Sequence, residues 1–173
     1  MWLVDAAGRR AAPDQGVLGL DLISPAAVPP LAEYDGDRQL RDEYAVLGYL
    51  ASSHPMALFA RTLRAVRPVP APELPRHVGK LVTCAGMLTT GKPVHTIHDE
   101  PMEFVTFDDG AGLIETVLFP EVYRRAAPLL FGPGPYLLRG KVEESYGAVT
   151  LTVTQLERLD RYAKRRGLPW QET

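Results

Sequence analysis

Hydrophobic residues recur at a helical spacing in the first part of the chain. From Arg38 to Leu50 they fall three or four positions apart with charged residues between them, which predicts an amphipathic helix. A second helix is predicted to begin at Pro55, because proline suits a first helical turn, and to reach about Arg64. We therefore expect a helical segment over residues 38–66, preceded by an irregular N-terminal segment, residues 1–37, in which no period is sustained.

A run rich in proline follows this helical segment. Residues 67–78 contain Pro68, Pro70, Pro72 and Pro75. This density of proline removes backbone donors and disfavours helix, so the pattern predicts an extended Pro-rich linker. We place the main domain boundary of the chain there.

Beyond the linker, apolar and polar residues alternate in short runs separated by turn signals, which is typical of strands. The expected strands cover residues 80–89, 102–108, 113–119, 136–142 and 149–154, with a short helix opening at Pro120. Val149, Leu151 and Val153 should face inward and the threonines between them outward. Gly86 is placed to let the first strand bend. Residues 155–173 are predicted to form a C-terminal helix and a tail.

Three strands, a helix and two strands within residues 79–154 are the element order of the five-stranded Greek-key barrel called the OB-fold. Closing a sheet into a barrel also removes exposed strand edges. The predicted fold class is therefore mainly β with flanking helices. An OB-fold domain, residues 79–154, is preceded by two short helices and followed by a C-terminal helix.

Composition narrows the class of protein further. The chain has 173 residues, 46% of them hydrophobic, and a formal net charge of −2, so nucleic-acid binding is expected to be local. No apolar run approaches the roughly 18 residues of a membrane helix, and the first residues lack a secretion signal, which predicts a cytoplasmic protein without a membrane partner. The single Cys84 excludes an internal disulfide and a Cys-rich zinc site.

The sequence offers few groups of residues that could form a catalytic or metal-binding site. His95 and His98 lie near two acidic residues, but prolines bracket the stretch as a loop and no third ligand follows at a defined spacing. No serine lies in a Gly-x-Ser-x-Gly motif. We expect His54, before Pro55, to cap or pack between the two helices. No catalytic residue, metal site or cofactor is predicted.

Two segments resemble a known family. Asp42-Glu43-Tyr44-Ala45-Val46-Leu47-Gly48-Tyr49-Leu50 and Ser53-His54-Pro55-Met56 resemble the helix and the Ser/Gly-His-Pro segment before the OB-fold of the bacterial DNA polymerase III alpha subunit family, including its error-prone branch. The order and spacing of its OB domain are similar to Val82–Leu88, Met102–Asp109 with Gly112, and Glu115–Phe119 with Pro120 and Tyr123. The resemblance spans residues 37–154. It implies a piece or relative of that polymerase without the palm and phosphoesterase-like domains, and therefore without catalysis.

The same resemblance implies how the barrel would contact nucleic acid. OB-folds stack bases on aromatic side chains of the second and third strands, and the loops between strands one and two and between strands four and five flank the strand. By analogy with the synthetase members of this superfamily, Phe104 is the stacking residue, Phe107 faces inward and Glu115 faces outward. The candidate site residues are Thr90 and Lys92 in the first loop, Phe104, Glu115, Arg139 and Lys141 on strands, and Tyr146 in the second loop.

Three functions follow as hypotheses. The first is a non-catalytic module that contacts single-stranded DNA in replication or translesion synthesis. The second is a protein-interaction module with little DNA affinity, bound to other polymerase or replisome proteins, because residues 79–154 carry six basic and nine acidic residues, a balance of −3. Basic residues after position 154 give that tail a balance of +2. The third is an RNA- or tRNA-binding protein, because Phe104-x-x-Phe107-Asp108-Asp109-x-x-Gly112 resembles the anticodon-binding domains of aspartyl, asparaginyl and lysyl tRNA synthetases. Two of these assignments have a purely structural alternative. Phe104 could fill the barrel interior, and the basic residues Lys92, Arg139 and Lys141 could simply form a solvated surface.

Overall fold

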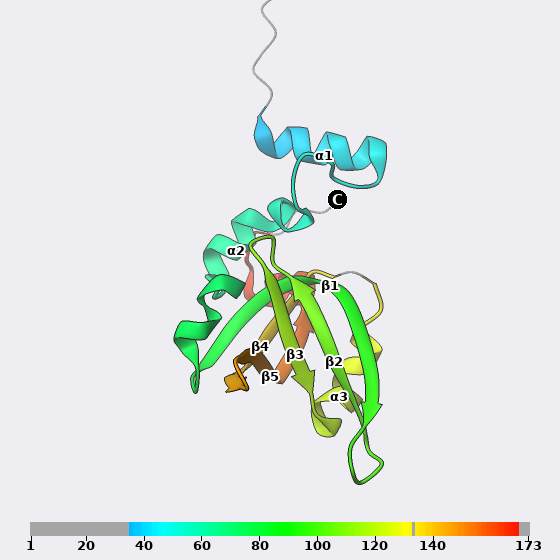
Figure 1. The fold of residues 1–173 in the computed structure, drawn as a ribbon. Helices are drawn as coiled ribbons and strands as arrows, with labels where there is room; N and C mark the ends of the chain where they lie inside the picture. Colours follow the sequence, from blue (N-terminus) through cyan, green and yellow to red (C-terminus); the bar gives the residue numbers. More distant parts are fainter. Residues whose placement is uncertain (1–34, 133, 170–173) are drawn as a thin grey trace, which may run out of the picture. The chain divides into compact units, whose positions relative to one another are not determined.

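A computed structural model describes residues 35–132 and 134–169, and the predicted irregular segment lies almost entirely outside this range. Figure 1 shows the arrangement of the elements. The α-helices are α1 (Gly36–Leu47), α2 (Ala60–Val66), α3 (Pro120–Ala126) and α4 (Leu159–Arg166), and the 3₁₀ turns are η2 (Pro55–Phe59), η3 (Ala71–His77) and η4 (Ala127–Leu129). The strands are β1 (Leu81–His95), β2 (Pro101–Asp108), β3 (Leu113–Leu118), β4 (Tyr136–Ser145) and β5 (Ala148–Arg158).

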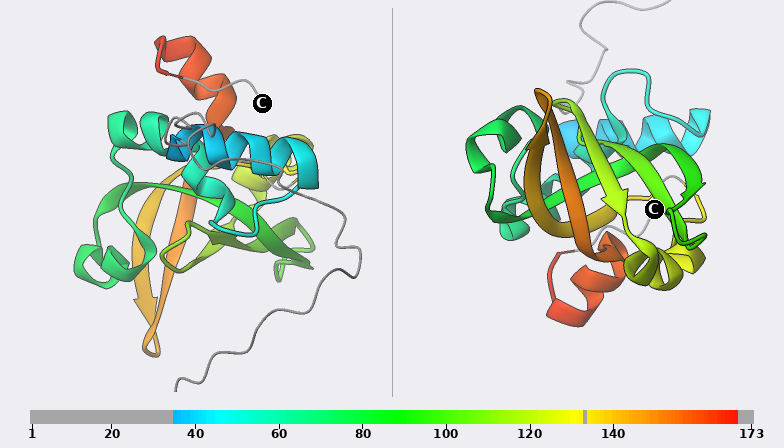
Figure 2. Two further views of the ribbon diagram at one scale, coloured as in Figure 1. Left: turned by 90° about the horizontal axis from the view of Figure 1, so that it is seen from above. Right: turned by 60° about the horizontal axis from the view of Figure 1, so that its bottom comes forward.

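The five strands close into a barrel in the order β1-β2-β3-β5-β4. Only β3 and β5 pair in parallel; the other neighbours are antiparallel. The first half of β1 pairs with β4 as far as Gly86, and its second half pairs with β2 from Met87 onward. Gly86 thus lies where the strand changes partner. The right-hand view of Figure 2 shows the closed barrel, which confirms the predicted fold class.

Side chains that alternate along the strands fill the barrel. Phe107 and Tyr136 are fully buried with their rings edge to face, their centroids 5.7 Å apart. Leu151 and Val153 are buried and Thr154 is exposed, as predicted for the last strand. The alternation of apolar and polar residues therefore identified the inner face of the barrel correctly.

Three strands are longer than their sequence patterns predicted by three or more residues. β1 continues beyond residue 89 to His95, because a bulge between Leu88 and Thr90 absorbs one residue and restores pairing with β2. Pro93 is tolerated because that half of β1 has β2 as its one partner. β4 extends to Ser145. The predicted helix from residue 155 instead begins at Leu159, because the preceding four residues continue the ladder between β5 and β4.

The predicted linker packs on the barrel. Ala71 and Leu74 of η3 are buried in the same cluster as the barrel core, and the Val69 amide donates to the Thr83 carbonyl at 2.8 Å. The Ala71 amide donates to Asp109 Oδ2 at 2.6 Å. An extended connector is therefore the wrong description for residues 71–77, because buried side chains and long-range hydrogen bonds hold this segment against the barrel.

The helices before the barrel begin and end close to the predicted bounds. α1 begins at Gly36 and η2 begins at Pro55. His54 Nδ1 accepts a hydrogen bond from the Met56 amide at 3.2 Å, which confirms its predicted capping role. Met56 and Leu159 of α4 share a second buried cluster with Leu137 of β4. Helical elements from both sides of the barrel sequence therefore pack on one side of it.

Candidate nucleic-acid interface

The outer surface of β1, β2 and β3 brings together four of the predicted site residues. Lys92 on β1 is opposite Phe104 on β2, and Thr90 is opposite Thr106, which in turn is opposite Glu115 on β3. Side chains two positions apart on a strand share a face, so these five residues form one surface, which we call the β1–β3 face. Figure 1 shows the three strands side by side, with this face toward the viewer.

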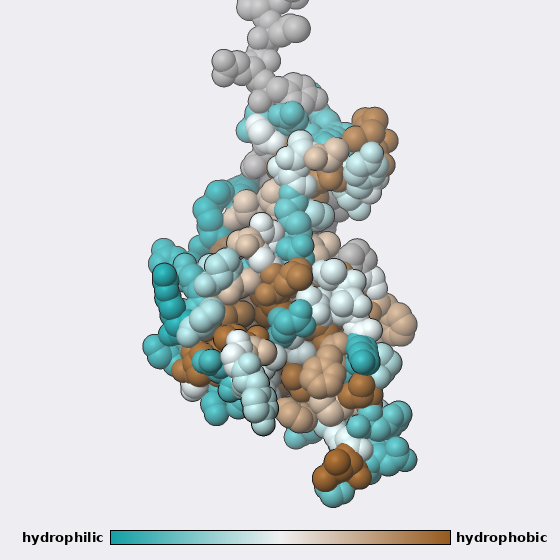
Figure 3. Space-filling view, viewed as in Figure 1, coloured by the Kyte–Doolittle hydropathy of each residue, from teal (hydrophilic) through white to brown (hydrophobic). Residues whose placement is uncertain are grey.

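An aromatic ring lies exposed in the middle of the β1–β3 face. Phe104 is 45% exposed, whereas Phe107, three positions later, is fully buried. Both orientations agree with the prediction, so Phe104 does not fill the barrel. In Figure 3, tan and brown side chains gather between teal ones over β2 and β3. A ring exposed on a β-sheet offers a flat platform for a nucleobase.

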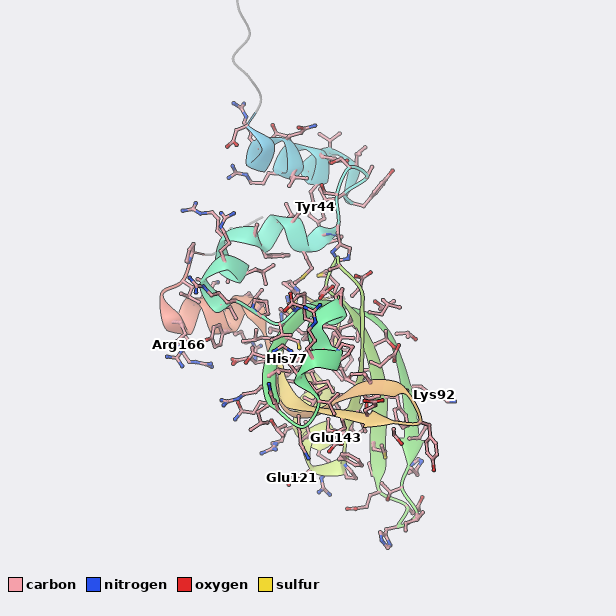
Figure 4. The ribbon with its side chains drawn as sticks, turned by 60° about the vertical axis from the view of Figure 1, so that its left-hand side comes forward. Tyr44, His77, Lys92, Glu121, Glu143 and Arg166 are labelled. Carbon is pink, nitrogen blue, oxygen red and sulfur yellow. The ribbon has the colours of Figure 1, made fainter. Side chains whose placement is uncertain are left out.

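The two lysines near this face differ in their charge environment. Lys92 is exposed, and no ion pair of its ammonium group is found among the described residues; Figure 4 shows it at the right-hand edge of the molecule. Lys141 Nζ lies 3.4 Å from Glu143 Oε1. A hydrogen bond from Thr152 Oγ1 to Glu143 Oε2, at 2.6 Å, and the contact with Lys141 hold the pKa of the Glu143 carboxyl below its usual value. Glu143 therefore offsets the charge of Lys141.

Hydrogen bonding also holds Glu115 in place. Its carboxylate accepts a hydrogen bond from Thr106 Oγ1 at 2.9 Å. Glu115 faces outward as predicted, but it adds negative charge two positions away from Val117, which pairs with Phe104. A carboxylate repels phosphate and accepts hydrogen bonds from base amino groups, so Glu115 suits contact with a base edge.

Both loops that flank an OB-fold interface present an exposed side chain. Tyr146 lies in the turn between β4 and β5 with a left-handed backbone (φ 52°) and is fully exposed. In the turn between β1 and β2, Ile97 is 96% exposed. The Thr96 hydroxyl accepts hydrogen bonds from the amides of His98 and Glu100 and so organises that turn. Ile97 was not predicted; the signal was an isolated apolar residue in a polar turn.

The structure moves two predicted residues from their expected places, and it separates Arg139, which lies on β4 as predicted, from the β1–β3 face. Thr90 and Lys92 belong to β1 rather than to the first loop, because the bulge prolongs the strand. Arg139 does not join the β1–β3 face. It pairs with Thr83 of β1 and Gln155 of β5, near α4, because β4 lies between the first half of β1 and β5 in the barrel. Although Arg139 and Lys141 share the outer surface of β4, they therefore have different surroundings.

Residues 35–132 and 134–169 contain no group of three or more His, Cys, Asp or Glu side chains that could hold a metal ion. Within the same ranges no helix is long and apolar enough to cross a membrane.

The closed five-stranded barrel with a helix between its third and fourth strands defines an OB-fold protein. No family model matches the chain. An error-prone DNA polymerase of Symbiobacterium thermophilum is 30% identical over 149 residues, which are 84% of this chain and 14% of that protein. The DNA polymerase III subunit alpha of Bacillus subtilis is 28% identical over 118 residues, which are 68% of this chain and 11% of that protein.

This chain is therefore related to the bacterial DNA polymerase III alpha subunits and their error-prone branch, as the sequence resemblance predicted. It spans only a small part of the length of these relatives. Among solved structures, an OBody named AM1L10, bound to hen egg-white lysozyme, matches with a TM-score of 0.43 and 18% identity, over 53% of this chain and 89% of that chain.

Proposed function

We propose that this protein is a non-catalytic nucleic-acid-binding module that contacts single-stranded DNA through the β1–β3 face. The observation that carries the proposal is the exposed ring of Phe104 with Lys92 directly opposite it in the register of β1 and β2. A base stacked on the ring would place its phosphate within reach of the lysine. The relationship to DNA polymerases supports DNA as the partner.

The surroundings of the ring suit weak binding that tolerates many sequences. A stacked base contributes roughly 1–3 kcal/mol by alanine substitution, and every base has a face that can stack. Ile97 and Tyr146 offer further apolar contacts from the two loops. Lys92 supplies the one cation of the β1–β3 face, so the electrostatic contribution is small.

Fluorescence anisotropy of a labelled oligonucleotide of about twelve thymidines, within the range of site sizes of OB-folds, tests this proposal. We expect saturable binding that weakens with salt, and a loss of about tenfold in affinity for Phe104→Ala. Phe131→Ala is the matched control, because Phe131 is 78% exposed and lies outside the β1–β3 face. Equal affinity of both variants and the parent would refute the proposed interface. Tighter binding of a uridine oligonucleotide of the same length would instead favour an RNA-binding function.

The cellular role and location belong to the same proposal. A cytoplasmic module of this kind would hold template DNA during replication or translesion synthesis, with polymerase or replisome proteins as further partners. The catalytic steps would be carried out by regions of such a polymerase that this chain does not match, because the chain matches only 11–14% of the length of the polymerases named above.

A protein-interaction module with little DNA affinity is the second candidate. α1 and the residues that follow it carry apolar side chains that are largely exposed: Tyr44 40%, Val46 82%, Leu47 48% and Tyr49 61%. Figure 4 shows Tyr44 on α1. Scattered apolar side chains are normal on a surface, but four within six residues are typical of a contact region. Absence of oligonucleotide binding at low salt would favour this candidate.

A further inference from the structure

A groove of about 460 Å³ lies between α4 and the side of the barrel formed by β1, β4 and β5. Its lining residues come from four elements: Thr83, Leu137, Arg139, Gln155, Leu156, Glu157, Tyr162, Arg165 and Arg166. We call it the α4 groove. Leu137 and Leu156 supply its apolar part and the arginines and Glu157 its charged part.

The charges of the α4 groove do not cancel. Arg165 forms two contacts of 2.9 Å with the Glu157 carboxylate, one from each terminal nitrogen. Arg139 and Arg166 remain, and among the described residues neither guanidinium has a carboxylate partner. The groove thus has three cations and one anion, an excess of two positive charges, although residues 79–154 as a whole are acidic.

The Tyr162 ring orients the guanidinium groups of two arginines in the groove. The guanidinium carbon of Arg166 lies 5.8 Å from the centre of the Tyr162 ring, and that of Arg165 lies 5.6 Å from it. Such contacts orient the guanidinium, so less conformational entropy is lost when it binds an anion. The Thr83 hydroxyl and the Gln155 amide add neutral donors, and neither has a hydrogen-bond partner among the described residues.

This groove is distinct from the β1–β3 face. None of its lining residues lies on β2 or β3. Figure 4 shows Arg166 on α4 and Lys92 on β1 at opposite sides of the view. A ligand in the groove would therefore leave Phe104 accessible.

We propose that the α4 groove is a second binding site, for phosphate groups, with Arg139 and Arg166 as the residues that contact the phosphate oxygens. Two guanidinium groups, a hydroxyl and an amide match the acceptors of a phosphate, and arginine binds this group with paired hydrogen bonds. The phosphate belongs either to a nucleic-acid strand or to a small phosphorylated compound. Phosphate binding in the groove does not depend on base stacking at Phe104, so it can be tested independently of the proposed DNA interface.

Side-chain NMR of the arginine Nε–H groups tests the proposal directly. In this experiment the full chain is to be titrated with inorganic pyrophosphate and, separately, with the thymidine oligonucleotide. The variants Arg139→Gln and Arg166→Gln serve to assign the two arginine signals. We expect saturable shifts of both signals with pyrophosphate, and an affinity about tenfold lower in the double variant Arg139→Gln/Arg166→Gln. The same shifts with the oligonucleotide, retained in Phe104→Ala, identify a nucleic-acid strand as the source; shifts with pyrophosphate alone identify a small compound.

A matched double variant separates a specific site from general attraction. Arg61→Gln/Arg76→Gln removes the same charge from exposed positions on α2 and η3, outside the groove, and should bind pyrophosphate like the parent. Circular dichroism confirms that both double variants are folded. The proposal is overturned if neither ligand shifts Arg139 and Arg166, or if both double variants lose affinity equally.

Discussion

Gly140 occupies a position on β4 that has no room for a side chain. A Cβ atom there would approach the backbone carbonyl of Thr152, with the carbonyl carbon 2.9 Å away, and the Leu151 side chain at 3.0 Å. We expect Gly140→Ala to lower the free energy of unfolding by about 2–3 kcal/mol, because the two strands must move apart. Urea denaturation measures this loss. Gly36→Ala is the control, since nothing lies within 4 Å of its Cβ position, and equal midpoints for the two variants would contradict the steric argument.

Glu103 carries a carboxyl group whose pKa is raised by burial. A raised pKa in the folded state favours the protonated form, so this contribution to stability is fully present below the unfolded value, near 4.5, and is lost as pH rises through the folded value. Glu103→Gln should therefore be more stable than the parent at neutral pH, with the gain shrinking as pH falls through this window. Unfolding measured across that pH range checks it. Glu144→Gln, at an exposed position, should show no comparable trend.

At the scale of elements, Asp109 joins the β2–β3 turn to η3. One carboxylate oxygen accepts hydrogen bonds from the Ala111 and Gly112 amides, both at 2.7 Å, and the other accepts from Ala71 at 2.6 Å. Asp109→Ala should lower the free energy of unfolding by about 3 kcal/mol and speed hydrogen exchange at the Ala71 amide, because three charge-assisted bonds are lost. Unchanged exchange there would mean that η3 is held by side-chain packing.

The neighbouring carboxylate provides the comparison for this prediction. Asp108 accepts one backbone bond, from Gly110 at 2.8 Å, and its Oδ1 lies 3.5 Å from His54 Nε2. Asp108→Ala should therefore destabilise the protein less than Asp109→Ala and leave the exchange of Ala71 unaffected. A reversed order would show that the contact of Asp108 with His54 contributes more than the three amide hydrogen bonds of Asp109.

At the scale of the whole molecule, the distribution of charge limits affinity for DNA. The carboxylate of Glu143 offsets the charge of Lys141. Lys141 on β4 pairs with Thr152 on β5, and Thr152 pairs with Val117 on β3, which is the partner of Phe104. We expect Glu143→Gln to release Lys141 and to tighten oligonucleotide binding about threefold at low salt, with the gain disappearing as salt screens the charge. Anisotropy titrations across a salt series measure it.

A neighbouring substitution distinguishes local release of Lys141 from a general change in net charge. Glu144→Gln changes the net charge equally, but Glu144 lies on the other side of β4 from Glu143 by strand alternation and has no contact with Lys141 among the described residues. It should tighten binding less than Glu143→Gln does. Identical effects would show that only net charge matters.

The sequence by itself determined the order of the elements and the side of each strand that faces the core. Phe104 and Phe107, or Leu151 and Thr154, differ in burial because a strand turns successive side chains to opposite faces, and this period is readable locally. The resemblance to the polymerase family likewise rests on short ordered motifs, and the relatives confirm it.

Only the tertiary structure decided which surfaces these elements build together. The docking of Ala71 on Asp109, the pairing of Lys141 with Glu143 and the separation of Arg139 from Phe104 all depend on which strands become neighbours in the barrel. Strand register is a long-range property, and one bulge at residue 89 suffices to move Lys92 from a loop to a strand. Local patterns carry no information on such pairings, so the β1–β3 face and the α4 groove become visible only in the folded chain.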